Sequence, residues 1–391
     1  MFPHTFMFLV FNLAYMLPIA YVHFFGFSQG GVEEIFNSDP SILSSMVVFY
    51  FVVLFFYLSA SSLFGFRFPC KRIEWQVPLQ LPFLVKVVFI MTLLALVISK
   101  ILLYPEGVYS AYAFDSGAME SRVWNVSMGL SELGVLIFAF CVITKNTKFA
   151  FLTFLIVSLN LLHGTRIFTL IILLMIVFYI IFINKRINKI KLFVYLIVFF
   201  FFILLSFLAI FIYRSNVSIT NINLDLIISP IVYESLFNQI SFIRMLGWLH
   251  GGHVPFAPEM LFSDSAIFTL PSFLFDDKLS LMYINNYGEL SPLGGLSGYA
   301  SAIIYFSYYY FIWYFILGMV SSLLLRSTSA TNFKITTRVL YIYFVCDSLF
   351  RFNRDPWFIV IKMLSNNLLF LLIILLIIAL QARMYKRRSI Q

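Results

Sequence analysis

Long apolar stretches are the feature of this sequence that most limits its fold. They cover residues 5–27, 42–64, 82–104, 126–144, 149–163, 167–183, 192–213, 299–325, 338–350 and 357–381. Because about 20 apolar residues in a helix cross the hydrocarbon core of a bilayer, we expect an all-α, polytopic integral membrane protein with about ten transmembrane helices. The composition, 62% hydrophobic and 11% charged, excludes a soluble enzyme and a disordered chain.

The spacing of these stretches predicts three regions. Residues 1–213 form an N-terminal membrane region of about seven helices, and residues 299–391 form a C-terminal membrane region of about three helices with a basic tail. Residues 214–298, the large loop, are too long for a turn and contain apolar runs. We therefore expect short helices in the large loop that lie on or in the outer leaflet.

The basic residues follow the topology of the chain. Most of the 26 Lys and Arg residues fall in one set of connections and in the C-terminal tail, whereas most of the 17 acids fall in the opposite set. Cytoplasmic loops of membrane proteins are enriched in Lys and Arg. Both termini are therefore expected to be cytoplasmic, and the large loop periplasmic. The net charge of +9 then orients the chain and gives no reason to expect nucleic acid as a partner.

A few basic residues break this rule and are expected on the outer side. They are Arg122, Arg166, Arg214, Arg244, Lys278, Arg351 and Arg354. An arginine guanidinium binds phosphate oxygens with two parallel hydrogen bonds and keeps its charge when partly dehydrated. This pattern suggests recognition of a lipid-linked phosphate or pyrophosphate. For Arg122 and Lys278, pairing with nearby acids is the competing interpretation.

The segment from Asn160 to Arg166 is a more specific signal of a functional site than the other outward basic residues. It forms the tip of a hairpin whose two arms, 149–163 and 167–183, are short for complete spans, so the tip is expected below the outer surface. Polar backbone at that depth persists only inside protein or beside a wet cavity. Arg166 and the first N–H groups of the second arm would bind an anion. An interfacial turn with a snorkelling arginine is the alternative.

The large loop contains the other set of polar candidates. Asn238, Ser241 and Arg244 recur at a spacing that predicts one polar face of a helix, and His250 and His253 follow in a His-Gly-Gly-His motif. The sequence offers no convincing third and fourth ligands for a metal beside the two histidines. A general base or a hydrogen-bonding group for sugar hydroxyls is the functional interpretation, and a structural role is the alternative.

Ionisable residues also occur inside the predicted spans. Asp347 and Arg351 are four residues apart, which predicts an ion pair on one helix face, and Arg354 follows one turn later. Glu132 and Lys362 are expected towards the outer leaflet. Such residues are functional candidates by default, with structural ion pairs as the competing explanation.

These features together resemble the Wzy-type O-antigen polymerases, which polymerise bacterial oligosaccharide repeat units. The resemblance covers the whole chain: the many spans, the inward termini, the large outer loop, the arginine at the Gly-containing hairpin, arginines in the large loop at Arg214 and Arg244, and the segment Pro292–Gly295 leading into the next span.

The resemblance implies transfer of a growing glycan from one undecaprenyl pyrophosphate carrier to a sugar hydroxyl on another, at the inner membrane of a bacterium. Neither metal nor cofactor is needed, because the donor is already activated. A chain-length regulator would be a further protein partner. The pyrophosphate ligands would be Arg166, Arg214, Arg244 and His163, then Arg351 and Arg354; the base candidates are His250, His253 and Glu234.

Two other functions remain open. An O-antigen ligase would carry out the same chemistry with a different acceptor. A flippase for lipid-linked oligosaccharides would make no bond and would need a polar route through both leaflets. The outward bias of the exceptional charges favours an enzyme over a flippase.

Overall fold

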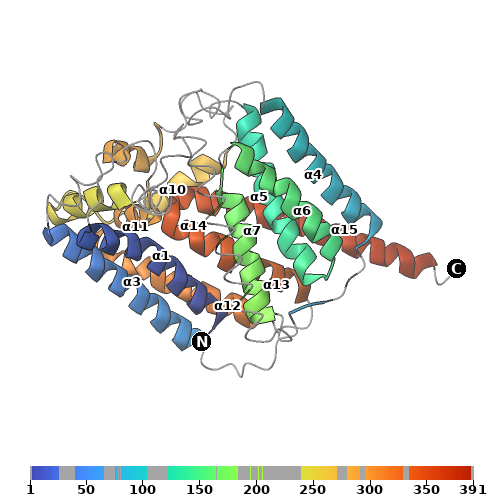
Figure 1. Cartoon of the computed structure of the whole chain (residues 1–391), viewed down its shortest axis with the longest axis horizontal. Helices are drawn as coiled ribbons and strands as arrows, with labels where there is room; N and C mark the ends of the chain where they lie inside the picture. The colour runs from blue at the N-terminus through green and yellow to red at the C-terminus, as the bar shows by residue number, and fades with distance from the viewer. Residues whose placement is uncertain are drawn as a thin grey trace. The chain divides into compact units, whose positions relative to one another are not determined.

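A computed structural model of the chain describes residues 2–25, 40–65, 75–103 except 78 and 80, 122–183 except 164, 239–270, 280–290, 296–328 and 334–388, with single residues at 194, 201 and 205. These residues form helices and, within these ranges, no strands, as expected for an all-α protein (Figure 1). The helices are α1 (Pro3–Phe25), α3 (Pro40–Gly65), α4 (Phe83–Leu103), α5 (Arg122–Ile143), α6 (Thr147–Ser158), α7 (Ile167–Phe178), the helix 239–250, α10 (Pro258–Thr269), α11 (Gly298–Phe306), α12 (Phe311–Ser327), α13 (Lys334–Tyr343), α14 (Leu349–Arg354) and α15 (Trp357–Arg388).

The helices gather into two compact units that combine distant parts of the sequence. Unit 1 consists of Met1–Pro69, Ile228–Arg326 and Asp347–Leu364, and unit 2 of Cys70–Ile227, Ser327–Cys346 and Ser365–Gln391. The units are defined by contacts between helices, whereas the three regions expected from the sequence follow the order of the chain. The two divisions therefore differ. Each unit is described by itself below.

Among the residues that the structure describes, four helices are long and apolar enough to cross a membrane, or five if the bent pair within 298–327 is counted as one span. The four are Ser44–Gly65 in α3, all of α4, all of α5, and Trp357–Gln381 in α15. Each coincides with a predicted span. Shorter apolar helices cover Pro3–Ile19, Thr147–Leu161 and Ile167–Ile183. The predicted span 192–213 lies almost wholly outside the described residues, and 338–350 is divided among α13, a π-helical turn at Phe344–Ser348 and α14. The chain thus has the long apolar helices of a membrane protein.

The stretch 299–325, expected as one span, is instead a broken helix. The segments Gly298–Tyr309 and Phe311–Ser327 meet at an angle of 112°. At the break, Ser307 has a φ of 50°, and its hydroxyl donates a 2.7 Å hydrogen bond to the Val254 carbonyl. The N–H of Ala257 donates to the carbonyl of Tyr305 at 3.1 Å. The large loop therefore supplies partners to backbone groups and side chains at the break, which an uninterrupted helix would not need.

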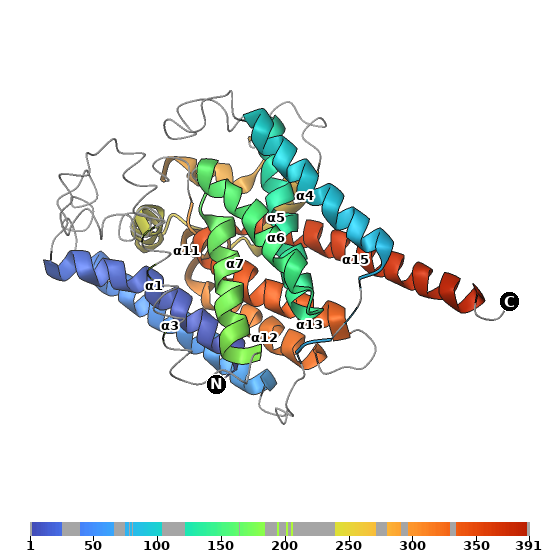
Figure 2. The same cartoon turned by 45° about the vertical axis from the view of Figure 1, so that its right-hand side comes forward.

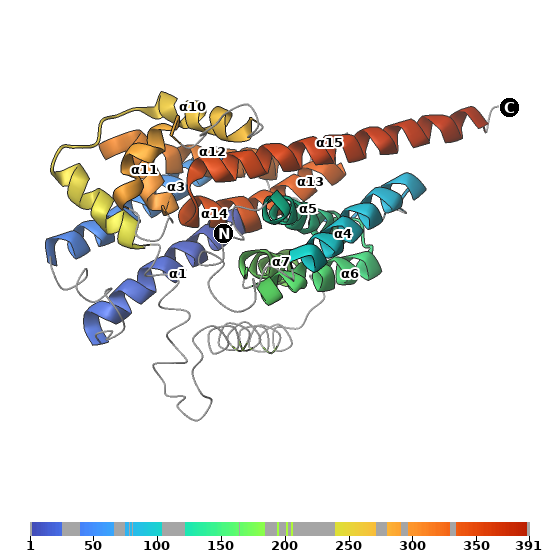
Figure 3. The ribbon, with the colours of Figure 1, turned by 90° about the horizontal axis from the view of Figure 1, so that it is seen from above.

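Unit 1 depends on very close helix packing. An added Cβ on Gly298, the first residue of α11, would lie 1.9 Å from the carbonyl oxygen of Phe352 in α14. An added Cβ on Gly318 in α12 would lie 2.5 Å from the carbonyl of Tyr57 in α3. Small residues at such crossings let two backbones approach, as is common in membrane proteins. In Figure 3, α1 lies beside α3 and α10 lies beside α11.

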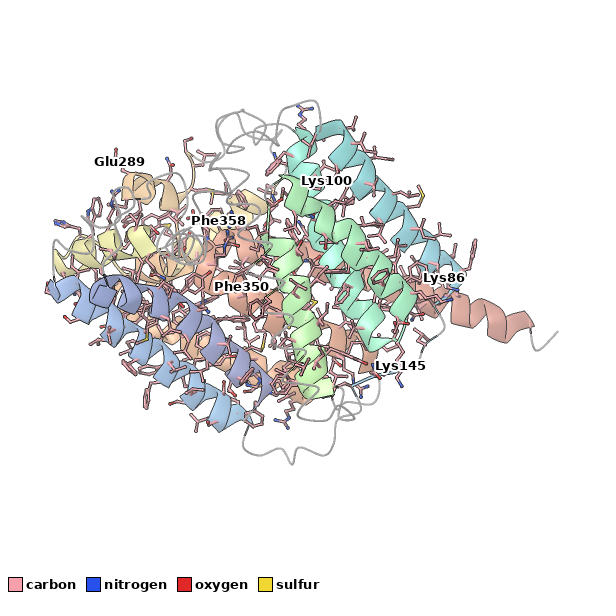
Figure 4. All side chains as sticks on the ribbon, in the orientation of Figure 1. Lys86, Lys100, Lys145, Glu289, Phe350 and Phe358 are labelled. Carbon is pink, nitrogen blue, oxygen red and sulfur yellow. The ribbon has the colours of Figure 1, made fainter. Side chains whose placement is uncertain are left out.

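Aromatic side chains fill the space around these crossings. The Trp357 ring stacks on that of Trp313 at 4.5 Å and lies 6.4 Å from that of Tyr305. Figure 4 labels two further members of this core, Phe350 and Phe358. The Phe350 ring packs 5.4 Å from Phe11 of α1, and the Phe358 ring 4.7 Å from Phe268 of α10. Aromatic pairs at these distances add to the stability gained from burial.

Unit 2 is a bundle around α5. Helices α5, α6 and α7 run side by side (Figure 2), and an added Cβ on Gly134 would lie 2.6 Å from the Val157 side chain. Glu132, in the buried part of α5, accepts hydrogen bonds from the Tyr343 hydroxyl and from the Asn367 amide of α15. Lys86 and Lys145 lie at one end of the bundle and Lys100 at the other (Figure 4).

The crossing at Gly298 yields the first testable prediction. Gly298→Ala should lower the free energy of unfolding by about 1–3 kcal/mol, because the new methyl group overlaps a backbone carbonyl that cannot move aside. Thermal unfolding of the protein in detergent measures the effect. Gly129→Ala in α5 is the control: its Cβ would meet nothing within 4 Å, so its melting temperature should stay equal or rise. Equal melting temperatures for both variants would contradict the close crossing.

Candidate functional site

The His-Gly-Gly-His motif of the large loop ends a helix. The helix 239–250 closes with two hydrogen bonds, from the Gly252 N–H to the Leu249 carbonyl and from the His253 N–H to the Trp248 carbonyl, both 3.0 Å. Gly252 has a φ of 74°, the left-handed conformation that this type of helix cap requires. The cap turns His253 back, so its ring lies 6.1 Å from that of Trp248.

One side of this helix and its cap is exposed. Arg244, Gly247, Trp248 and His250 are exposed, as is His253. We call these five residues the helix-end surface. Gly247 leaves open space where a side chain would stand. The surface therefore combines one cation, one indole ring and two imidazoles with accessible backbone.

The opposite side of the helix is buried and anchors the surface in unit 1. The Ser241 hydroxyl accepts a 3.0 Å hydrogen bond from the Ser297 N–H, and the Tyr308 hydroxyl donates a 2.6 Å hydrogen bond to the Leu249 carbonyl. Ser241 is thus buried while Arg244 is exposed, although both were expected on one polar face. Both anchors lead to α11 and the turn that follows it, so the broken helix fixes the position of the helix-end surface.

Asp264 of α10 is a buried residue that sequence reasoning missed. Its carboxylate accepts hydrogen bonds from the Tyr283 N–H at 2.7 Å, the Ile284 N–H at 3.0 Å and the Tyr305 hydroxyl at 2.8 Å. The first two bonds start the 3₁₀ helix Tyr283–Leu290. In the sequence, Asp264 was one acid among several of the large loop, and only its side of the membrane was inferred.

The 3₁₀ helix brings Tyr287 to the helix-end surface. The Tyr287 ring lies 6.0 Å from that of Trp248, and its hydroxyl lies 2.9 Å from that of Tyr283. Burial and the Tyr283 hydroxyl raise the pKa of Tyr287 above its ordinary value, so the phenol stays neutral. Glu289, exposed on the same 3₁₀ helix, is the acid labelled in Figure 4.

The arginines of α14 form a chain of ion pairs. The Arg351 guanidinium donates to Asp347 at 2.7 Å and to Asp355 at 3.1 Å, and Arg354 donates to Asp355 at 2.7 Å. The predicted pairing of Asp347 with Arg351 on one helix face is therefore confirmed. Arg351 is only 3% exposed and Arg354 is 26% exposed. Each positive charge is matched by a carboxylate, so an anionic ligand would have to compete with Asp355.

The hairpin tip of unit 2 is organised by Asn160. Its carbonyl accepts from the N–H and the hydroxyl of Thr165, both at 3.1 Å, and its side-chain oxygen accepts from Ser131 of α5 at 3.1 Å. His163 ends the 3₁₀ helix Leu159–His163, and Arg166, half-buried, is the N-cap residue of α7. The tip is therefore held by protein hydrogen bonds.

The remaining sequence candidates are distributed as follows. Arg214, Glu234 and Lys278 lie outside the described residues. His163 and Arg166 belong to unit 2, whereas Arg244, His250, His253, Arg351 and Arg354 belong to unit 1. Lys362 of α15 places its ammonium 4.4 Å from the centre of the Phe268 ring, a cation–π contact within unit 1. Of the expected set, the structure thus joins Arg244, His250 and His253 on one surface.

In the part of the chain that the structure describes, no group of three or more His, Cys, Asp or Glu side chains could hold a metal ion. Comparison of the chain with protein-family models, with curated proteins and with solved structures finds no match.

The role of Asp264 can be tested by removing its charge. Asp264→Asn should lower the free energy of unfolding by about 1.5–3 kcal/mol, because the amide cannot accept at both oxygen positions and one donor loses its charged partner. Thermal unfolding in detergent gives the value. The control is Glu259→Gln, an exposed acid on the same helix, which should change stability by less than about 0.5 kcal/mol. Equal effects of the two variants would show that the Asp264 hydrogen bonds do not contribute to the free energy of unfolding.

Proposed function

We propose that the protein polymerises lipid-linked oligosaccharide repeat units at the periplasmic face of the bacterial inner membrane, with both termini in the cytoplasm. The substrates would be two undecaprenyl-pyrophosphate-linked glycans. The product would be a longer glycan on one carrier and a free undecaprenyl pyrophosphate. The proposal rests on the sequence resemblance and on the chemistry of the helix-end surface.

The exposed combination of Arg244, Trp248, His250 and His253 is the observation that carries the proposal. A pyrophosphate-linked sugar presents an anion and a polar ring with apolar C–H faces. Arginine suits the anion, the indole ring offers an amphipathic surface for the sugar, and an imidazole nitrogen can accept a proton from a hydroxyl. These three kinds of group lie within ten residues of one helix end.

In the proposed reaction, the acceptor hydroxyl oxygen forms a bond to the anomeric carbon of the donor sugar. The bond from that carbon to the phosphate oxygen breaks, and undecaprenyl pyrophosphate leaves with the electron pair. His250 or His253 would take the proton of the acceptor hydroxyl. Arg244 would stabilise the negative charge on the departing pyrophosphate, and positive charge would develop at the sugar ring.

The other expected ligands and partners also have roles in this proposal. Arg166 and His163 at the hairpin tip remain proposed pyrophosphate ligands, as do Arg214 and, for the base, Glu234. Arg354 is more accessible than Arg351 and would be the better ligand of the α14 pair. The bilayer holds both carriers, and a chain-length regulator is a proposed protein partner. The proposal includes no nucleic acid, metal or cofactor.

An O-antigen ligase is the second candidate, since the same surface would serve a different acceptor. A flippase requires polar groups through both leaflets. Two ionisable residues inside the predicted spans contact protein neighbours. Glu132 of α5 accepts a hydrogen bond from Tyr343, and Lys362 of α15 lies over the Phe268 ring, which favours transfer chemistry over transport.

Deletion of the gene in its own host separates these functions. We expect surface glycolipid that carries a single repeat unit, seen as one band on gel electrophoresis, because export and ligation would still operate. Bare lipid A core with carrier-linked polymer would instead identify a ligase. Repeat units trapped in the cytoplasmic leaflet would identify a flippase. Unchanged polymer would exclude all three.

Two arginine variants test the site. Arg244→Ala should slow polymerisation about 10- to 100-fold, the effect of losing one charge-assisted phosphate contact of about 1.5–3 kcal/mol. Arg166→Ala should abolish long polymer while single repeat units still reach the surface. Chain-length profiles of strains with matched protein levels provide the measurement. Arg122→Ala, an exposed arginine at the start of α5, is the control and should leave the profile unchanged. Normal chain lengths in either variant would remove that residue from the site.

A further inference from the structure

Exposed aromatic side chains gather at the break between α11 and α12. Phe256, Tyr308 and Tyr309 are 50%, 55% and 54% exposed, and the Phe256 ring packs 5.4 Å from that of Tyr309. We call these three residues the aromatic turn. Adjacent exposed rings are uncommon on a surface that faces only water, and they usually mark contact with another molecule or with a membrane.

The packing of α12 on α3 places the break near the start of an apolar segment. The Tyr310 ring, which directly follows the aromatic turn, stacks on that of Phe49 at 4.1 Å. Gly318 meets Tyr57 the same number of residues further along both helices, so α12 and α3 run parallel. Phe49 is five residues into the segment Ser44–Gly65, a rise of about 8 Å. For a membrane-spanning α3, this register puts the aromatic turn close to one boundary of the hydrocarbon core.

A row of neighbouring rings connects the aromatic turn with the middle of that segment. The Tyr309 ring lies 6.2 Å from that of Phe311, which stacks on Phe56 at 4.5 Å. The Phe56 ring in turn lies 5.5 Å from that of Phe55. Phe55 is 65% exposed at the middle of the apolar segment, where acyl chains would surround it in a membrane. The aromatic turn therefore continues an exposed apolar face of α3 and is not an isolated patch.

Two side-chain hydrogen bonds join the broken helix to the end of the helix 239–250. The Tyr308 hydroxyl donates to the Leu249 carbonyl at 2.6 Å, and the Ser307 hydroxyl donates to the Val254 carbonyl at 2.7 Å. Leu249 also accepts the Gly252 N–H in the helix cap. The depth of the aromatic turn in a membrane would therefore set the depth of the helix-end surface.

We propose that the aromatic turn is a membrane-docking surface that lies among the headgroups and upper acyl chains of the phospholipids in the outer leaflet. Tyrosine is enriched at this boundary, because its ring is apolar while its hydroxyl can stay wet. Docking there would hold the helix-end surface at headgroup level, where the pyrophosphate of a lipid-linked substrate lies. This role in substrate placement rests on the proposed function, whereas the contact with phospholipid does not.

Photochemical crosslinking tests what covers the aromatic turn in the full-length protein, reconstituted in vesicles of phosphatidylethanolamine and phosphatidylglycerol. The photoreactive amino acid p-benzoylphenylalanine replaces Phe256 or Tyr309 in separate variants, and under ultraviolet light it attaches to a C–H bond of its nearest neighbour. Mass spectrometry should find phospholipid adducts at both positions, with yields similar to that at Phe55. The matched control is Glu259, an exposed acid three residues from Phe256, where lipid adducts should be several-fold fewer.

Lipid yields at Phe256 and Tyr309 no higher than at Glu259 would overturn the proposal. Adducts to a second copy of the chain would overturn it equally, because a protein would then cover the surface. The assay contains no glycan substrate, so its outcome is independent of the gene deletion that tests polymerisation.

Tyr308→Phe tests the link between the aromatic turn and the helix-end surface. Amide hydrogen exchange of residues 249–253 should become several-fold faster, because the Leu249 carbonyl loses one of its two donors. Lipid adducts at Phe256 should stay equal, since the Tyr308 ring is retained. Unchanged exchange would overturn the role of the aromatic turn in positioning the helix-end surface.

Discussion

The hydrogen bonds of the Asp264 carboxylate hold the described parts of the large loop together. The carboxylate joins α10 to the start of the 3₁₀ helix Tyr283–Leu290 and to Tyr305 near the break between α11 and α12. Without that charge, two backbone N–H groups and one phenol would compete for weaker acceptors in a buried position. The same three bonds determine where Tyr287 stands beside Trp248, so a structural acid shapes the exposed surface without belonging to it.

How much the sequence could predict depends on whether an interaction is local. The apolar stretches predicted α3, α4, α5 and α15, and the four-residue spacing of Asp347 and Arg351 predicted their ion pair, because helix geometry alone decides both. The three partners of Asp264 lie 19, 20 and 41 residues away, and no spacing rule reaches that far. The break at Ser307 was missed for the same reason, since its hydroxyl partner is 53 residues distant.

The His-Gly-Gly-His motif shows that a structural and a functional interpretation need not exclude each other. Gly252 is required by the backbone, because a φ of 74° strains any residue with a side chain. The cap also decides the neighbours of His253, whose ring packs against Gly251 and near Trp248. The spacing of His250 and His253 is therefore explained by the end of the helix. The same cap leaves both imidazoles exposed.

Arg351 and Arg244 differ in their exposure and in their ion pairs. Arg351 is almost completely buried and bonded to two carboxylates, so removing either acid would leave a charge in a low-dielectric setting. Its charge is largely committed to holding α14 at the start of α15. Arg244 stands on an exposed helix face, where a guanidinium keeps its hydration until a ligand replaces it. A phosphate can gain more from such a residue, because among the residues that the structure describes no ion pair of Arg244 must first be broken. Accessibility and pairing, which the sequence does not contain, therefore favour Arg244 over Arg351 as the proposed anion ligand.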